Sequence, residues 1–247
     1  MSTRNSKLWL IGLSMLLAMA CTSTQTIKSN NRWTDETLAA ALENSSRPKA
    51  DRDRDADRKP VQLMTFFGVE RGMTVVDLIA GAGYMTEVCA IATGSEGKVY
   101  SQHLGVNKNL DARLAGNRLP NVERVDTNII PAQPGSIDVV ITVMNLHDLY
   151  NSDLPITQAA MKYMLSLLKP GGVLAVVDHV GIAGADNAKL HRMTKQQAID
   201  VVTQAGFVLE AESNLLAHTG DDHTRSVIDP SIRGKTDQFI LKFRKPT

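Results

Sequence analysis

One stretch, residues 72–87, constrains the fold of this chain more than any other. An apolar strand pattern runs from Thr74 to Ile79 and leads into the bend Gly81-Ala82-Gly83, and a helical pattern begins at once at Tyr84. Glycines at such a bend let the backbone approach a ligand where a Cβ would collide, and the start of a helix points free N–H groups into the same space. This pattern is typical of the first β-loop-α unit of a nucleotide-binding α/β sheet.

Strand and helix patterns alternate through the rest of the chain. Strands that are separated by helices indicate an α/β fold with a parallel sheet and helices on both faces. After the first strand, we predict strands at residues 97–102, 122–126, 137–143, 173–178, 207–214 and 238–243, and helices at residues 84–93, 106–115, 154–168 and 194–205.

Residues 34–68 precede this alternation and predict a helical cap, so that the α/β domain itself covers residues 69–247. The cap contains a run of charges at residues 47–59, in which Asp51 and Arg54 stand three residues apart and can pair along one helix face. Such a run is consistent with a solvated helix or with a polar lid over a ligand pocket.

The first 21 residues resemble the signal of a bacterial lipoprotein. Arg4 and Lys7 precede an uncharged apolar run, residues 8–20, that is short for a membrane span but fits the core of a signal peptide. Small residues stand directly before Cys21, as in the lipobox whose cysteine carries the lipid. The resemblance implies a chain anchored to the outer membrane on its periplasmic face, with residues 22–33 as a tether. An ordinary cleaved signal with a coincidental cysteine is the alternative.

Composition limits the partners of the domain. A lipidated Cys21 would leave only Cys89, so no internal disulfide is expected. The net charge of +1 provides no basic field for nucleic acid, and aromatic residues, at 4%, are too scarce for a base-stacking platform. We therefore expect a small-molecule substrate, membrane contact through the N-terminal lipid alone, and no nucleic-acid partner. The sequence does not identify a protein partner.

Several motifs, taken in order, resemble the class I S-adenosylmethionine-dependent methyltransferases over about residues 45–245. They are the glycine loop that follows Asp77 and the late Leu-Lys-Pro-Gly-Gly-Val-Leu-Ala-Val-Val-Asp of residues 168–178. More narrowly, the chain is similar to a family of predicted exported methyltransferases. The motifs of that family stand here at residues 47–60, 145–148, 178–179 and 234–237.

This resemblance implies a Rossmann-like sheet of seven strands with an antiparallel last strand, and S-adenosylmethionine as the cofactor. It also implies where that cofactor would lie. The residues it places around the cofactor are Asp77, Gly81, Gly83 and Tyr84 in the loop, His103 beside the ribose, and Asp126 beside the adenine amino group. A capping or turn role is the alternative for Asp126.

Two positions depart from the pattern of the class. Ile79 replaces the first glycine of the loop, and His103 stands where an acidic residue usually accepts both ribose hydroxyls. A neutral histidine accepts only one hydrogen bond. The leading hypothesis is methyl transfer to a small molecule. The alternative is a non-catalytic or metal-assisted envelope lipoprotein that reuses the fold without S-adenosylmethionine.

All six histidines fall on segments that should meet at the carboxyl edge of the sheet, where open parallel sheets bind ligands. His147 is our first catalytic candidate, because a histidine near its ordinary pKa can take a proton from an attacking oxygen or nitrogen. Asp148 and His179 are the other two. A packing role for His147 is the alternative.

The spacing of these residues does not by itself indicate a metal site, since there is no close pair of histidines and no cysteine cluster. We therefore predict no metal ligand. A set made of His147, Asp178, His179 and a loop residue remains the metal-binding alternative.

Overall fold

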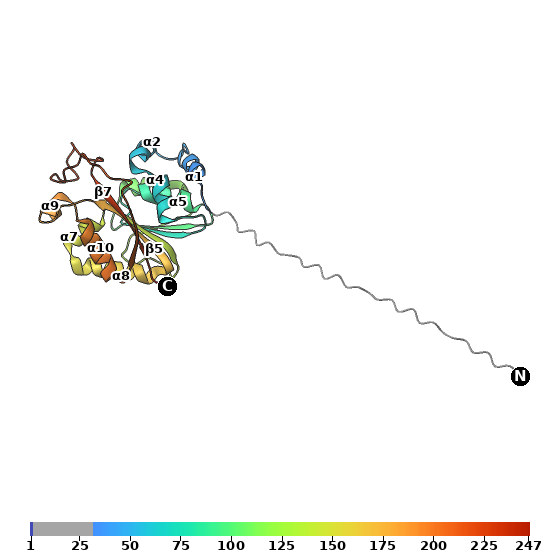
Figure 1. Cartoon of the computed structure of the whole chain (residues 1–247). Helices are drawn as coiled ribbons and strands as arrows, with labels where there is room; N and C mark the ends of the chain where they lie inside the picture. Colours follow the sequence, from blue (N-terminus) through green and yellow to red (C-terminus); the bar gives the residue numbers. More distant parts are fainter. Residues whose placement is uncertain (2–31) are drawn as a thin grey trace. The chain divides into compact units, whose positions relative to one another are not determined.

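The computed structural model of the chain describes Met1 and residues 32–247, and residues 32–247 belong to one compact unit (Figure 1). The predicted signal peptide, Cys21 and residues 22–31 of the predicted tether lie outside the described residues. Within the part of the chain that is described, no helix combines the length and the apolar character that a membrane crossing requires.

A seven-stranded sheet with the order β3-β2-β1-β4-β5-β7-β6 forms the centre of this unit. Strands β1 to β5 pair in parallel, and β7 is antiparallel to both of its neighbours. This confirms the predicted fold class. The strands are Thr74–Leu78 (β1), Lys98–Gln102 (β2), Val122–Val125 (β3), Ile137–Val143 (β4), Leu168–His179 (β5), Val208–Ser213 (β6) and Gln238–Arg244 (β7).

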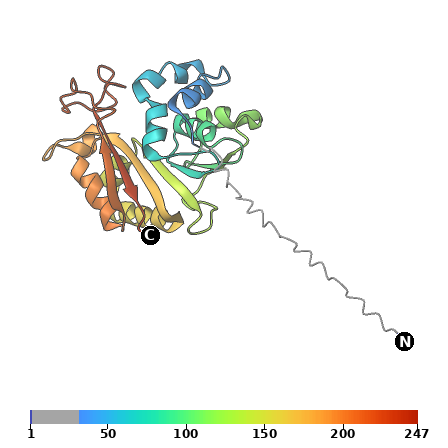
Figure 2. The same ribbon diagram turned by 45° about the vertical axis from the view of Figure 1, so that its right-hand side comes forward.

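Helices cover both faces of the sheet (Figures 1 and 2). Successive residues of a strand point to opposite faces, so Val75 enters the apolar core beneath α1, α4 and α5, while Val76 enters the core beneath α7, α8 and α10. The helices are Asp35–Leu42 (α1), Lys49–Arg52 (α2), Asp55–Arg58 (α3), Pro60–Phe67 (α4), Tyr84–Thr93 (α5), Lys108–Leu114 (α6), Leu146–Ser152 (α7), Leu154–Leu167 (α8), Asn187–Leu190 (α9) and Lys195–Gln204 (α10).

The direction in which the strands are added to the sheet reverses between β1 and β4. Strands β2 and β3 lie on one side of β1, and β4 and β5 lie on the other. Such a switch point leaves a crevice beyond the carboxyl ends of the strands. The loop between β6 and β7 and the helix α2 lie at the same end of the sheet in both views (Figures 1 and 2).

The charge run at residues 47–59 does not form a solvated helix. It forms the two short helices α2 and α3, and Arg47 and Asp51 are only 2% and 4% exposed. Asp51 does pair with Arg54, at 2.6 Å, but it also pairs with Arg113 beyond the cap. The polar-lid interpretation of this segment is therefore the one that the structure favours.

Strand β5 begins five residues earlier than predicted. The Lys169-Pro170-Gly171-Gly172 sequence suggests a turn, and this part of β5 is irregular: Leu168 pairs with Ile137, the next pair is Val173 with Val139, and Gly171 between them has a φ of +72°. A Cβ on Gly172 would lie 2.9 Å from the carbonyl oxygen of Lys169, so the close approach requires glycine there.

Candidate active site

The loop after β1 keeps the backbone shape of a glycine loop although its first glycine is missing. Ile79 has a φ of +59°, and Met144, at the end of the adjacent β4, has a φ of +60°. A β-branched residue in this left-handed region carries a strain of about 1–3 kcal/mol. The side chain of Ile79 packs against the core beneath α7 and α8. Strained backbone therefore flanks the switch point on both central strands.

The two remaining glycines of the loop have different surroundings. A Cβ on Gly83 would lie 2.7 Å from Leu110, so this position packs tightly against α6. A Cβ on Gly81 would meet nothing within 4 Å, and the φ of Gly81 is +56°. Gly81 therefore leaves open space beside the start of α5, which is what a ligand that approaches the backbone would need.

Asp77 lies between the sheet and α5. Its carboxylate accepts a hydrogen bond of 2.6 Å from Thr86 Oγ1, and Thr86 is also within 2.9 Å of Ser101 Oγ. Burial raises the pKa of Asp77 to about 7, against an ordinary value of 3.8. Asp77 thus stabilises the glycine loop through its hydrogen bond to Thr86 on α5. It does not line the cavity described below.

Residues of the N-terminal helical cap contact Tyr84. The Tyr84 hydroxyl donates a hydrogen bond of 2.6 Å to Asp55 on α3, and Asp55 in turn pairs with the buried Arg47. The guanidinium of Arg58 lies 4.6 Å from the centre of the Tyr84 ring, within range of a cation–π contact. Burial and the hydrogen bond to Asp55 raise the pKa of Tyr84 above its usual range. The tyrosine therefore anchors the lid to the first residue of α5.

The expected ribose and adenine positions lie beyond β2 and β3. His103 is half-buried, and its Nδ1 has no hydrogen-bond partner among the described residues. Gln102 Oε1 accepts a hydrogen bond of 3.0 Å from the Ile79 amide. Asp126 is exposed and accepts a hydrogen bond of 2.6 Å from Arg124. Of these three side chains, only His103 has a buried polar atom, Nδ1, that forms no hydrogen bond with the described residues.

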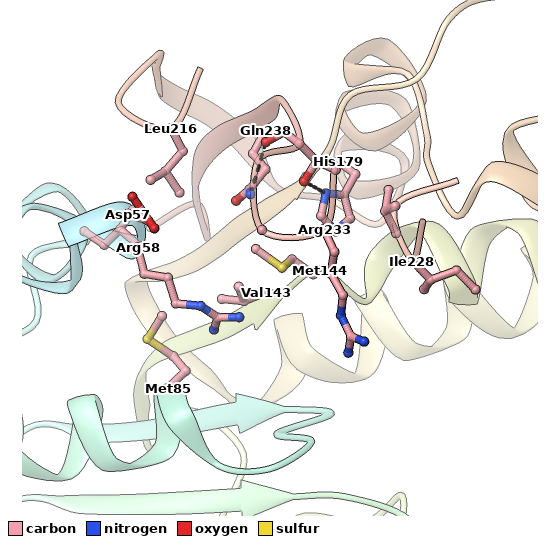
Figure 3. A pocket seen from close by; sticks show the side chains of 14 residues that line it. Asp57, Arg58, Met85, Val143, Met144, His179, Leu216, Ile228, Arg233 and Gln238 are labelled. Atoms are coloured by element: carbon pink, nitrogen blue, oxygen red, sulfur yellow. Dashed lines mark hydrogen bonds between the residues drawn. The ribbon is translucent and has the colours of Figure 1, made fainter. Parts of the chain in front are cut away.

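A cavity of about 250 Å³ lies at the carboxyl ends of β4 and β5 (Figure 3). The guanidinium groups of Arg58 and Arg233 extend into the same space from different sides, below His179 (Figure 3). Among residues 32–247, no carboxylate lies within ion-pairing distance of either arginine. The apolar residues of the lining include Met85, Val143, Met144, Leu216 and Ile228.

His179 is the one predicted catalytic residue that lines this cavity. Its Nδ1 shares a hydrogen bond of 2.9 Å with Thr236 Oγ1, which leaves Nε2 for another partner. Burial lowers the pKa of His179 to about 4, although the neighbouring Asp178 opposes the shift. The ring is therefore neutral near pH 7.

His147 and Asp148 lie beside the cavity, at the start of α7. His147 is 2% exposed, and its Nδ1 lies 2.6 Å from Asp178 Oδ1. The ring centres of His147 and His179 are 5.7 Å apart. Burial opposes the charged form of His147, but the hydrogen bond and the charge of Asp178 prevail and raise its pKa. The sequence places these residues at one edge, and the structure joins them in one network.

The β6–β7 loop is held over the cavity by a buried ion pair. Both Arg192 and Asp221 are nearly inaccessible to solvent, and they form a two-point contact with distances of 2.9 and 3.0 Å. Asp221 also accepts a hydrogen bond of 2.8 Å from the Asp237 amide. Because a buried two-point contact fixes orientation, it positions the loop that carries Arg233. The sequence alone does not indicate this pairing.

No protein-family model matches the chain. The chain is similar to proteins called ubiquinone/menaquinone biosynthesis C-methyltransferase UbiE, with 25% identity to that of Idiomarina loihiensis and 29% to that of Shewanella pealeana, each over 182 residues. Each match covers 71% of this chain and 65% of the relative, so the chain spans slightly less than two thirds of the length of these curated relatives.

Solved structures resemble the chain over most of its length. An S-adenosylmethionine-dependent methyltransferase from Aquifex aeolicus matches with a TM-score of 0.60 and 18% identity, and the match covers 86% of this chain and 99% of that one. The [4+2]-cyclase SpnF matches with a TM-score of 0.59 and 18% identity, over 83% of this chain and 86% of SpnF. These likenesses, together with the strand order, show that the chain has the class I methyltransferase fold.

Proposed function

We propose that this protein transfers a methyl group from S-adenosylmethionine to a small molecule that has an apolar body and an anionic group. The observation that carries the proposal is the cavity at the ends of β4 and β5, which combines an apolar lining with Arg58, Arg233 and a neutral His179. The similarity to the UbiE proteins, whose name states C-methyl transfer, supports the same type of reaction.

The residues beyond β1 and β2 fit the proposed cofactor. The space beside Gly81 is open, so the cofactor could pass close to the protein backbone there. Among the described residues, His103 Nδ1 is a buried polar atom without a hydrogen-bond partner. One ribose hydroxyl could donate a hydrogen bond to this nitrogen. When bound, S-adenosylmethionine would supply an activated methyl group on a sulfonium. The protein would then contribute mainly by holding the acceptor in line with it.

The charges of the cavity favour an acceptor that reaches the site as an anion. Two guanidinium groups without carboxylate partners can bind a carboxylate or a phenolate, and Arg is well suited to such oxygens. Methylation at the oxygen of an anionic acceptor removes no proton, so it needs no strong base, which agrees with the low pKa of His179. We assign Arg58 and Arg233 to binding this anion, and His179 to orienting the acceptor through Nε2.

A transfer assay tests this proposal. The protein would be incubated with S-adenosylmethionine labelled in its methyl group and with a panel of apolar carboxylates, phenols and matched uncharged amides. We expect label in one or more anionic acceptors. We also expect R58Q and R233Q to raise KM for that acceptor at least tenfold, because each removes a charge-assisted contact of about 1.5–3 kcal/mol. Arg32 is exposed and remote from the cavity lining, so R32Q is the matched control. Transfer to the uncharged amides alone would contradict the proposed acceptor class.

We further propose that the protein is an exported lipoprotein. The support is the signal-like run of residues 8–20 followed directly by Cys21. On this proposal the lipid holds the enzyme at a membrane surface, and its substrate is a molecule of the cell envelope.

A further inference from the structure

Three side chains near the cavity gather their metal-binding atoms in one place. His147 Nε2 lies 3.1 Å from Asp148 Oδ1, and His191 Nδ1 lies 2.9 Å from the same oxygen. One ligand atom from each residue falls within 4.8 Å of the other two. His147 and Asp148 come from α7, and His191 follows α9, so the site joins two separate elements.

These separations agree with the edges of a metal coordination sphere. Bonds of about 2.0–2.2 Å from zinc to nitrogen or oxygen place neighbouring ligand atoms of a tetrahedron roughly 3.3 Å apart. The two distances within the cluster are slightly shorter than this. The third separation, between the ligand nitrogens of the two histidines, is within 4.8 Å. Asp148 and His191 have partly exposed side chains that can adjust around an ion.

Asp178 orients the first ligand. It is fully buried, and its two oxygens contact the Nδ1 and the backbone amide of His147 at 2.6 and 2.8 Å. A carboxylate that holds one ring nitrogen while the other faces outward is the usual support of a metal-binding histidine. Asp178 therefore fixes the ring so that Nε2 points toward Asp148.

The backbone at His191 supports the same arrangement. His191 has a φ of +53°, and this left-handed residue ends α9. Asn151 on α7 donates a hydrogen bond of 2.9 Å to the carbonyl oxygen of Arg192, which ties the two elements together. The side chains of Asp148 and His191 are 56% and 40% exposed. Water therefore has access to the outer side of the cluster and could complete the coordination.

We propose that His147, Asp148 and His191 bind one divalent transition-metal ion of the zinc type. Two imidazoles and one carboxylate favour zinc, cobalt or nickel over magnesium or calcium, which prefer oxygen ligands. The site lies next to the acceptor cavity, since the His147 ring is adjacent to the His179 ring that lines it. The ion would join α7 to the end of α9 and hold this wall of the cavity in place.

A cobalt titration tests the site. The full chain, purified without a histidine tag and stripped with a chelator, would be titrated with Co²⁺ while the visible absorption of cobalt is recorded, and Zn²⁺ would then be added as a competitor. We expect one equivalent of Co²⁺ to bind with visible bands of low-symmetry coordination, and Zn²⁺ to abolish them. H191A and D148N should each weaken binding by at least tenfold. D178N should weaken it by about 10–100-fold, because it removes the support of His147.

His218 is exposed and lies outside the cluster, so H218A is the matched control and should bind as the wild type does. H191A changes a partly exposed residue, and circular dichroism would confirm that it is folded. The proposal is overturned if the wild type binds no Co²⁺ at micromolar concentrations, or if H191A and D148N bind it as tightly as the wild type. These results are independent of S-adenosylmethionine binding, so they do not bear on the proposed methyl transfer.

Discussion

Replacing Asp77 by Asn tests how the buried carboxyl beneath the glycine loop contributes to the pH dependence of stability. The pKa of Asp77 is about 7 in the folded protein, because of burial, against an ordinary value of 3.8. Between pH 3.8 and about 7, the Asp77 carboxyl is therefore protonated in the native state and ionised in the unfolded chain. The resulting stability is fully present below pH 3.8 and is lost as the pH rises through about 7.

The size of the effect follows from these two values. Proton linkage between pH 5 and pH 8 reduces the free energy of unfolding of the wild type by about 2–3 kcal/mol through this group. D77N has no proton to lose, and its amide oxygen can still accept the hydrogen bond from Thr86. Relative to the wild type, the variant should therefore gain about 2–3 kcal/mol between pH 5 and pH 8.

Denaturant unfolding at pH 5, 6.5 and 8, with linear extrapolation to water, measures this difference. Asp126 is exposed, so D126N is the matched control and should follow the wild type. Profiles of D77N and the wild type that stay parallel would refute the argument, because Asp77 would then titrate alike in the folded and unfolded chains.

Four further substitutions test other parts of the account. I79G should leave the free energy of unfolding within about 1 kcal/mol, because relief of backbone strain offsets lost packing, and should tighten cofactor binding in calorimetry. Y84F should cost about 1.5–3 kcal/mol in thermal or chemical unfolding, because it removes the hydrogen bond to Asp55. The pKa of His179 falls from 6.5 to about 4 on folding, so the wild type should lose stability as the pH falls from 6.5 toward 4, and H179N should lose less in the same acid titration. C21S should move the protein from the membrane fraction to the soluble fraction; unchanged retention would count against lipidation.

Much of the fold could be predicted because single segments carry complete signals. The helix Tyr84–Thr93 and the strand Ile137–Val143 have the predicted bounds. Each has a strong apolar pattern and a clear boundary residue, such as Gly83 before α5. Helix α7 was not predicted, since its seven residues follow β4 directly and no side chain caps its first turn.

The candidate site was harder to predict because its residues meet only in three dimensions. The predicted placement of the histidines after β4 and β5 follows from sheet topology alone. The roles of Arg58 and Arg233 depend on which charges remain without partners after folding, and no spacing rule contains that information. His191 lies close to His147 because the backbone turns in a left-handed conformation at His191, at the end of α9. The sequence does not predict this turn. The cofactor-loop assignments of Asp77, Gly81, Gly83 and Tyr84 stay predictions, as do His103 and Asp126.

Calorimetric titration with S-adenosylmethionine and S-adenosylhomocysteine tests the central claim most directly. The account predicts saturable binding of one ligand per chain. It also predicts weaker binding for G81V, since a side chain there would enter the open space beside α5 and strain a backbone with a φ of +56°. Absence of binding to the wild type at millimolar ligand would contradict the claim that this fold still serves as a methyltransferase.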